Sequence, residues 1–374
     1  MKPYIASDLR DMNRRTIFQL LSENDEISKA ELARRSGIST PTVIKIVDFL
    51  LEKGLVLETG ERSTALGRKP VMLKLNKGAF YAAGVILEGE YIRAGLVNLL
   101  REIGPVSVRH VGTDLSEGLG AALPEMIASL IASAGIEPSR VKGIGIGVPG
   151  GYNPDAHEVN FAPLVNINGP QSIERYERAL EQRFGAPVYV DNDANMAVLG
   201  EHQARKNPPD LIYISLGTGI GAGLVLDGKL RRGGTRQCGE IGYMTFIESY
   251  AAGRSTPGWL ESRVNLKALR EKFGFEPFRP DGGNLKEIID YVSAPVSVCV
   301  SNIVSILDCQ TVVLGGVLAQ ALGEPFLESV AGRVKDLSVL DVSIQAQLCP
   351  DPGIVGAASV ALDRAVKNLL TEDE

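Results

Sequence analysis

Polar residues near the middle of the chain could bind a ligand. The apolar run 188–190 predicts a short buried strand, and Asp191, Asn192, Asp193 and Asn195 follow it at once. Ligands of open α/β sheets bind at the carboxyl ends of strands. Carboxylates accept hydrogen bonds from hydroxyls, and an Asn amide both donates and accepts. The segment therefore predicts a polar binding site, although an Asn-Asp pair is also common in turns and helix caps.

A glycine-rich segment follows this motif. The predicted strand 211–216 runs into alternating glycines over 217–223, and a second apolar strand at 224–226 comes next. Glycine lets backbone N–H groups approach a phosphate or a sugar closely, because it has no side chain and tolerates unusual φ values. A glycine-rich turn by itself is more often only a tight hairpin. The order and spacing of several motifs must therefore decide between the two interpretations.

Three motifs in a fixed order carry a resemblance to a known family. They are VDNDAN at 190–195, SLGTGIGAG at 215–223 and GEIG at 239–242. The chain resembles the ROK family of bacterial repressors, open reading frames and sugar kinases over almost its whole length. The resemblance implies an α/β protein whose body is a two-lobed actin-like ATPase (ribonuclease H-like) ROK domain. It also implies that a sugar or sugar derivative binds between the lobes.

The resemblance assigns a set of residues to the effector site. In the family's kinases the residue matching Asp193 is the general base, whereas in its repressors this residue accepts a hydrogen bond from the sugar. Glu240 and Glu261 match further hydroxyl-binding positions. The predicted ligand-binding residues are Gly150, Asn192, Asp193, Glu240, Tyr243 and Glu261.

The chain departs from the kinases where they bind phosphate. Their D-x-G-G-T motif binds metal and phosphates, and the matching residues here are Ile86, Glu88, Gly89 and Glu90. Two carboxylates at this place repel phosphates instead of neutralising them. We therefore expect a kinase-like domain with a degraded phosphate-binding motif, no enzymatic activity and no cofactor.

A second departure concerns zinc. The family has one His and three Cys at positions that hold Tyr243, Ala252, Arg254 and Trp259 here. None of these is a good zinc ligand, so no metal is expected. Without zinc, we expect other packing to hold the loop 244–258. We expect Trp259 to fill the space of the missing zinc site and Arg254 to be available to pair with an anionic group of the ligand.

The N-terminal segment has the pattern of a helix-turn-helix. An amphipathic helix at 8–22 precedes a capping box formed by Ser28 and Glu31, and the second helix ends at Gly37. A third helix, capped by Ser39 or Thr40, follows after a tight turn. In such motifs the last of these helices enters the major groove. The residues off its buried stripe are predicted to contact DNA: Thr40, Thr42 and Lys45.

Two alternating strands after the third helix predict a wing. They lie at 55–60 and 71–75, with the sequence GRKP at 67–70 between them. Arg68 and Lys69 at a thin, extended loop tip are suited to a narrow A·T-rich minor groove. The loop also resembles the G-R-[GK]-P loop of ROK repressors. The alternative, an ordinary helical hairpin with a solvated face, does not explain these strands.

Composition separates a basic head from an acidic body. Residues 1–78 contain 14 Lys and Arg against 10 Asp and Glu, a net charge of +4. Because the net charge of the whole chain is −6, the remaining residues carry −10. Only the head is therefore expected to meet a polyanion. The four scattered cysteines indicate no disulfide framework. Charges at Asp8, Arg10 and Asp11 argue against a signal peptide, and no run reaches the roughly 18 apolar residues of a membrane helix, so we expect a cytoplasmic protein.

These observations predict three parts. Residues 1–78 form a winged helix-turn-helix domain, residues 79–195 form a first ROK lobe completed by a C-terminal helix at 353–370, and residues 196–352 form a second lobe. The predicted function is a transcriptional repressor of carbohydrate-related genes that binds a double-stranded DNA operator as a homodimer or homotetramer, with no membrane partner. Two alternatives stay open: a ROK sugar kinase with an added DNA-binding domain, and a regulator controlled by a protein partner.

Overall fold

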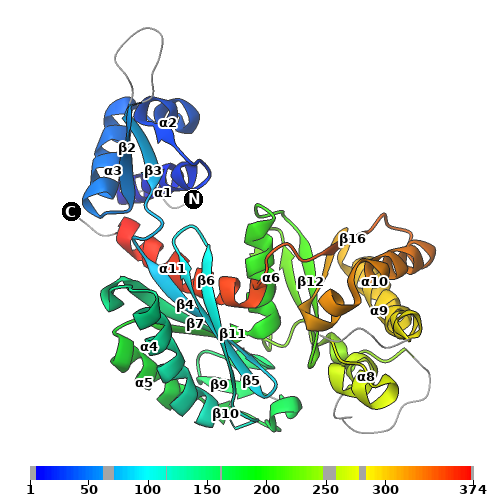
Figure 1. Cartoon of the computed structure of the whole chain (residues 1–374). Helices are drawn as coiled ribbons and strands as arrows, with labels where there is room; N and C mark the ends of the chain where they lie inside the picture. The colour runs from blue at the N-terminus through cyan, green and yellow to red at the C-terminus, as the bar shows by residue number, and fades with distance from the viewer. Residues whose placement is uncertain are drawn as a thin grey trace.

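The structure is a computed structural model, and it shows a small head set on a two-lobed body (Figure 1). It describes residues 6–61, 71–114, 116–160, 162–246, 258–277 and 284–371. Each lobe of the body is built around a five-stranded sheet. The domain bounds 1–78, 79–195 and 196–352 stay predictions.

The head consists of three helices and a small sheet. Ser28 caps α2, since its hydroxyl accepts a hydrogen bond from Glu31 N at 3.2 Å, while the Glu31 carboxylate pairs with Arg34. Gly37 ends α2 with a φ of 70°, a conformation that glycine adopts without strain. The sheet order is β1-β3-β2, and β2 and β3 are antiparallel. The elements are α1 (Ala6–Ser22), β1 (Ile27–Ser28), α2 (Lys29–Ser36), α3 (Thr40–Glu52), β2 (Val56–Glu61) and β3 (Val71–Leu75).

The first lobe is a sheet of order β11-β7-β4-β5-β6 covered on both faces. Side chains alternate along β4: Ala83 and Val85 pack with α4, whereas Ala82 and Ile86 face the C-terminal helix α11. A small sheet of β8, β9 and β10 lies beside it. The bounds are β4 (Tyr81–Glu88), β5 (Tyr91–Asn98), β6 (Ile103–His110), α4 (Leu123–Ser133), β7 (Val141–Val148), β8 (Gly151–Asn153), β9 (Glu158–Asn160), β10 (Gln171–Ser172), α5 (Glu174–Phe184), β11 (Val188–Asn192) and α11 (Pro352–Thr371).

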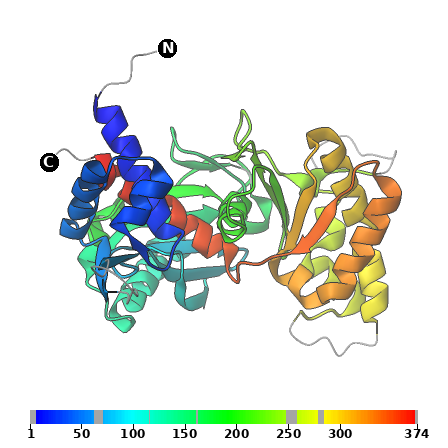
Figure 2. The same cartoon turned by 90° about the horizontal axis from the view of Figure 1, so that it is seen from above.

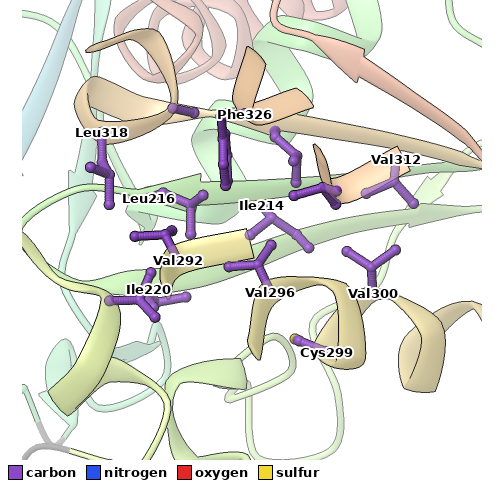
Figure 3. Packing of buried hydrophobic residues seen from close by; sticks show 14 of the residues in the cluster. Ile214, Leu216, Ile220, Val292, Val296, Cys299, Val300, Val312, Leu318 and Phe326 are labelled. Carbon is purple, nitrogen blue, oxygen red and sulfur yellow. The ribbon is translucent and has the colours of Figure 1, made fainter. Parts of the chain in front are cut away.

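The second lobe is a sheet of order β14-β13-β12-β15-β16. Helices α9 and α10 cover one face, and Figure 3 shows Val292, Val296 and Val300 of α9 packed against strand residues such as Ile214. Helix α6 covers the other face. The bounds are α6 (Asp193–Ala204), β12 (Leu211–Leu216), β13 (Ile220–Leu226), β14 (Lys229–Leu230), α7 (Glu261–Val264), α8 (Leu266–Phe273), α9 (Leu285–Leu307), β15 (Thr311–Gly315), α10 (Gly316–Leu337) and β16 (Ser343–Ala346).

Helix α9 is long and apolar enough to cross a membrane by length and composition. However, 61% of its most apolar window is buried inside the protein. Its valines pack on the second sheet, so its apolar face is already covered by the chain itself. The hydropathy of α9 therefore reflects a core helix.

Helices α6 and α11 cross between the two sheets with their backbones in contact. A Cβ added at Gly356 of α11 would lie 1.8 Å from Met196 O of α6, and one added at Gly200 of α6 would lie 2.1 Å from Pro352 O. Only glycine permits such an approach. Because α6 also covers the second sheet and α11 the first, this crossing joins the lobes.

Helix α11 also reaches the head. Arg14 of α1 is only 2% exposed, and its Nη1 donates a hydrogen bond to Leu370 O at the end of α11, at 3.2 Å. The same guanidinium lies 3.8 Å above the ring of Phe49 on α3. Apolar residues of the head and of α11 share one continuous core. Figure 2 shows α11, in red, running from beneath the head to the junction of the lobes.

The close crossing predicts opposite effects for two helical Gly→Ala substitutions. Gly356→Ala places a methyl group against the α6 backbone, so it should lower the free energy of unfolding by about 2 kcal/mol or more. Gly332→Ala in α10 meets no atom within 4 Å and should raise it by about 0.5–1 kcal/mol. Urea or thermal unfolding of both variants measures this. Equal stability of the two variants would contradict the crossing as described.

Candidate functional site

The amino end of α6 brings two predicted ligand-binding residues together. Asn192 ends β11 and caps α6, since its Oδ1 accepts a hydrogen bond from Asn195 N at 3.1 Å. Its Nδ2 donates to Gly150 O at 3.0 Å. The turn after β7 and the end of β11 are thus tied to each other. Because β7 and β11 are parallel neighbours, both ligand-binding segments leave the first sheet at its carboxyl edge.

Asp193 is the first residue of α6, and its carboxylate accepts a hydrogen bond from Ala194 N at 2.8 Å. Burial, aided by the negative charges of Glu240 and Glu88, raises the pKa of Asp193 to about 7, against the lowering effect of the Ala194 hydrogen bond. Glu240 comes from the second lobe and Glu88 from the first. Asp193 therefore lies where the two lobes face each other.

The second lobe contributes Glu240, Tyr243 and Glu261. Gly239 fixes the position of the neighbouring Glu240. The φ of Gly239 is 96°, and a Cβ added at Gly239 would lie 1.8 Å from Ala222 O on β13. Burial, followed by the charge of Glu261, raises the pKa of Glu240 to about 7. Tyr243 ends the short helical turn that begins one residue after Glu240.

Glu261 is buried at the start of α7 and its Oε1 accepts a hydrogen bond from Ile220 N at 3.2 Å. Burial raises the pKa of this carboxyl as well. The α7 segment meets the Glu240 segment directly, because a Cβ added at Gly258 would lie 2.4 Å from Gly242 O. The structure therefore gathers carboxyl groups from both lobes, and they can accept several hydroxyl hydrogen bonds at once.

The residues predicted to replace the kinases' phosphate-binding motif are side chains of the first lobe. Ile86 is buried, and its Cδ1 lies 2.5 Å from a Cβ added at Gly147. Glu88 faces the second lobe, where its Oε1 lies 3.2 Å from a Cβ added at Gly217. Arg93 Nη1 lies 3.8 Å from Glu88 Oε2, and Arg93 also pairs with Asp351. Burial raises the pKa of Glu88 against the opposing charge of Arg93.

Two of the four positions predicted to replace the family's zinc ligands, Tyr243 and Trp259, are described in the structure. Trp259 packs edge-on against Phe246, with ring centroids 5.3 Å apart, and Arg263 lies 3.9 Å above its ring. Ala252 and Arg254 lie outside the described residues. Within the described residues, no three His, Cys, Asp or Glu side chains are grouped so that they could hold a metal ion.

The exposed face of α3 presents two of the predicted DNA-contacting residues. Thr40 and Lys45 are exposed, whereas Thr42 is half-buried with its hydroxyl 2.9 Å from Ser39 Oγ. The predicted inward residues of α3 are fully buried. Ile44 is 39% exposed beside Lys45. The helical pattern alone did not identify it, yet its position suits apolar contact with a thymine methyl group.

The wing of the head is described only in part. Strands β2 and β3 form its two arms, whereas Arg68 and Lys69, which the sequence predicts at its tip, lie outside the described residues. Their predicted contact with the minor groove stays a prediction.

Comparisons with known proteins agree with this architecture. The ROK family profile matches residues 83–364, and a winged helix-turn-helix DNA-binding profile matches residues 10–56. The chain is 30% identical over 362 residues to the xylose repressor of Caldicellulosiruptor bescii, covering 89% of each chain.

Two solved structures are also similar. A ROK family transcriptional regulator, homologous to the E. coli MLC protein, superposes with a TM-score of 0.75 at 19% identity, over 98% of this chain and 100% of that one. This likeness shows the fold. A ROK family glucokinase from Streptomyces griseus, in complex with glucose and AMPPNP, has a TM-score of 0.62 at 25% identity, over 76% of this chain and 99% of that one.

Fold, head and comparisons together define a DNA-binding transcriptional regulator with a sugar-kinase-like body. Within that class, the chain belongs to the ROK family. The resemblance inferred from the three sequence motifs is thereby confirmed.

The raised pKa values predict a stability that falls as pH rises. Asp193 and Glu240 titrate at about 7 in the folded protein but near about 4 in an unfolded chain. Between about pH 4 and about pH 7, the folded state binds more protons than the unfolded state. The stability that these protons contribute is therefore lost as the pH rises through this range. Glu240→Gln removes one such titration. The melting temperature of this variant minus that of the wild type should therefore increase from about pH 5 to about pH 8.

Glu137→Gln is the control, because the Glu137 side chain is exposed on the first lobe. Its difference from the wild type should not change with pH. A Glu240→Gln difference that is equally flat would contradict the burial of this carboxyl in the candidate site.

Lys45 provides a test of the DNA-binding face. If its ammonium contacts a phosphate, Lys45→Ala should weaken binding to all DNA sequences and reduce the slope of log affinity against log salt by about 1. A DNA fragment selected from a random pool with the purified protein serves as the probe. Lys77→Ala is the control, since Lys77 pairs with Glu102 at the base of the head. Equal salt slopes for the two variants would remove α3 from the interface.

Proposed function

We propose that this regulator is a repressor of carbohydrate-related genes whose affinity for its operator is set by a sugar bound between the lobes. Asp193 directly follows β11 of the first lobe, and a Cβ added at Gly147 of β7 would lie 3.1 Å from its Cα. The convergence of this residue with Glu240 and Glu261 of the second lobe carries the proposal. These buried acceptors, with Asn192, suit the vicinal hydroxyls of a sugar. The related xylose repressor supports both parts of the proposal. The site of action is the cytoplasm, where such a regulator reaches its DNA.

The proposed regulator does not transfer phosphate. Phosphoryl transfer depends almost wholly on positioning and neutralising the phosphates. Here Ile86 fills the space of a metal-binding carboxylate, and Glu88 brings a negative charge to Gly217 of the glycine-rich hairpin. The similarity to a glucokinase keeps a kinase as the second candidate. Sustained ATP-dependent phosphorylation of any sugar by the purified protein would establish it.

A sugar in the cleft acts on DNA through the geometry of the body. The head is fixed to α11 by Arg14, and α11 is packed on the first sheet, so head and first lobe form one unit. Closure of the cleft then moves the second lobe relative to the head. In a homodimer or homotetramer joined through the body, this motion changes the spacing of the two heads on an inverted repeat. A ligand alters DNA affinity only through such differential binding to two states.

Asp193→Ala tests this proposal directly. Loss of a buried acceptor leaves a sugar hydroxyl without a hydrogen bond, which costs about 1–3 kcal/mol of binding free energy. The sugar concentration that releases half of the bound operator should therefore rise about ten- to a hundredfold. Asp155→Ala is the control, because Asp155 is exposed on the first lobe. The measurement is a titration of the operator complex with the sugar that most raises the melting temperature.

Operator affinity without sugar should be the same in both variants and the wild type. An Asp193→Ala protein that releases the operator at the wild-type sugar concentration would show that the cleft is not the sensor. That result would favour control by a protein partner.

A further inference from the structure

A segment of the second lobe contacts the first lobe beside the candidate site. We call residues 231–239 the strap; they connect the edge strand β14 to Glu240. The strap is anchored at both ends on the second sheet, because Arg231 N donates to Leu224 O at 2.8 Å and Ala222 N donates to Gly239 O at 2.9 Å. Between these anchors it leaves the sheet and turns at Gly233, whose φ is 78°.

The strap touches the first lobe beside a predicted ligand-binding residue. A Cβ added at Gly151, next to Gly150, would lie 2.9 Å from Arg236 O and 3.0 Å from Gln237 Cγ. The backbone of the strap therefore rests directly on the start of β8. Within the strap, Cys238 N donates to Arg232 O at 3.2 Å and Arg236 N to Gly233 O at 3.4 Å, so it forms a turn with its own hydrogen bonds.

One ion pair ties the strap to the site. Arg232 Nε donates to Asp191 Oδ2 at 2.6 Å, and the two side chains are 38% and 14% exposed. The other oxygen of Asp191 accepts hydrogen bonds from Asn192 N at 2.8 Å and Asn195 Nδ2 at 2.9 Å. Asp191 thus holds the first turn of α6 and the strap at the same time.

We propose that Arg232 is a positioning residue that holds the strap closed over the sugar cleft and thereby sets how long the sugar stays bound. Asp191, Asn192 and Asp193 are consecutive, so a strap fixed on Asp191 lies beside the two residues predicted to bind the sugar. Glu240 follows the strap directly and is placed by the same closure. The part of this proposal that concerns the sugar rests on the proposed function, whereas the part that concerns the strap does not.

The first experiment needs no sugar. Hydrogen exchange of the Arg236 and Cys238 amides, both hydrogen-bonded within the strap, reports whether the strap is held down. In Arg232→Gln these amides should exchange about five- to tenfold faster than in the wild type, because a charge-assisted hydrogen bond is lost. Arg231→Gln is the matched control, since Arg231 is the exposed neighbour and the change removes the same charge. Arg232→Lys should restore part of the protection.

The second experiment follows the sugar. The sugar is chosen from a panel of pentoses, hexoses and amino sugars as the one that most raises the melting temperature. Trp259 is the only tryptophan and lies two residues before Glu261, so its fluorescence can report binding of this sugar. The dissociation rate from Arg232→Gln should be about five- to tenfold faster than from Arg231→Gln. Raising the salt concentration should speed dissociation from the wild type more than from Arg232→Gln.

The outcomes separate the two proposals. Equal exchange and equal dissociation rates in Arg232→Gln and Arg231→Gln would overturn the role of Arg232, even if Asp193→Ala loses its response to sugar. If no sugar of the panel binds, the proposed function fails, while the exchange experiment still decides whether Arg232 holds the strap.

Discussion

The contact of two helix backbones between the lobes is the constraint on which the rest of this structure depends. Gly200 of α6 and Gly356 of α11 bring the helices so close that neither position has room for a side chain. Helix α6 starts at the candidate sugar site, and α11 ends under the head. One crossing therefore connects the ligand, the junction of the lobes and the DNA-binding domain. A packed contact of this kind transmits rigid-body motion because a close-packed interior does not deform continuously.

The candidate site gathers buried carboxyl groups that suit hydroxyl ligands better than phosphates. Asp193 and Glu240 have pKa values raised to about 7, mainly by burial. Glu88, in the predicted degraded phosphate-binding motif, adds a further carboxyl whose pKa is raised by burial. The same arrangement accounts for both halves of the proposed function. Buried acceptors favour a sugar, whereas a carboxyl such as Glu88 does not neutralise phosphates, although Arg93 pairs with it.

Local features of the structure could be predicted from sequence because neighbouring residues determine them. The Ser28 cap, the Gly37 end of α2 and the cap of α6 by Asn192 follow from rules that span a few residues. The start of α4 could not be predicted in this way, since residues 116–122 form a π-helical turn before α4 begins at Leu123. Amphipathic spacing does not separate these two helical forms.

Contacts between distant segments could not be predicted in this way. From the sequence, Arg14 is one of several charged residues expected on an exposed helix face. In the structure it is buried against Leu370 at the other end of the chain. Arg232 has no motif of its own, and only the folded chain places it on Asp191. The family resemblance named candidate sugar contacts residue by residue, but it gave no partner for either arginine. Such partners depend on tertiary packing, which a local pattern does not encode.

The central claim is that head and first lobe move as one unit against the second lobe when the cleft binds its sugar. Pulsed electron resonance between pairs of spin labels measures the distances between these parts. The labels are attached to cysteines introduced, in a Cys238→Ser background, at three exposed positions: Lys53 of the head, Glu137 of the first lobe and Val339 of the second lobe. On sugar binding, the distance from the head to the second lobe should change while that from the head to the first lobe stays the same. A change confined to the distance between head and first lobe would contradict the account.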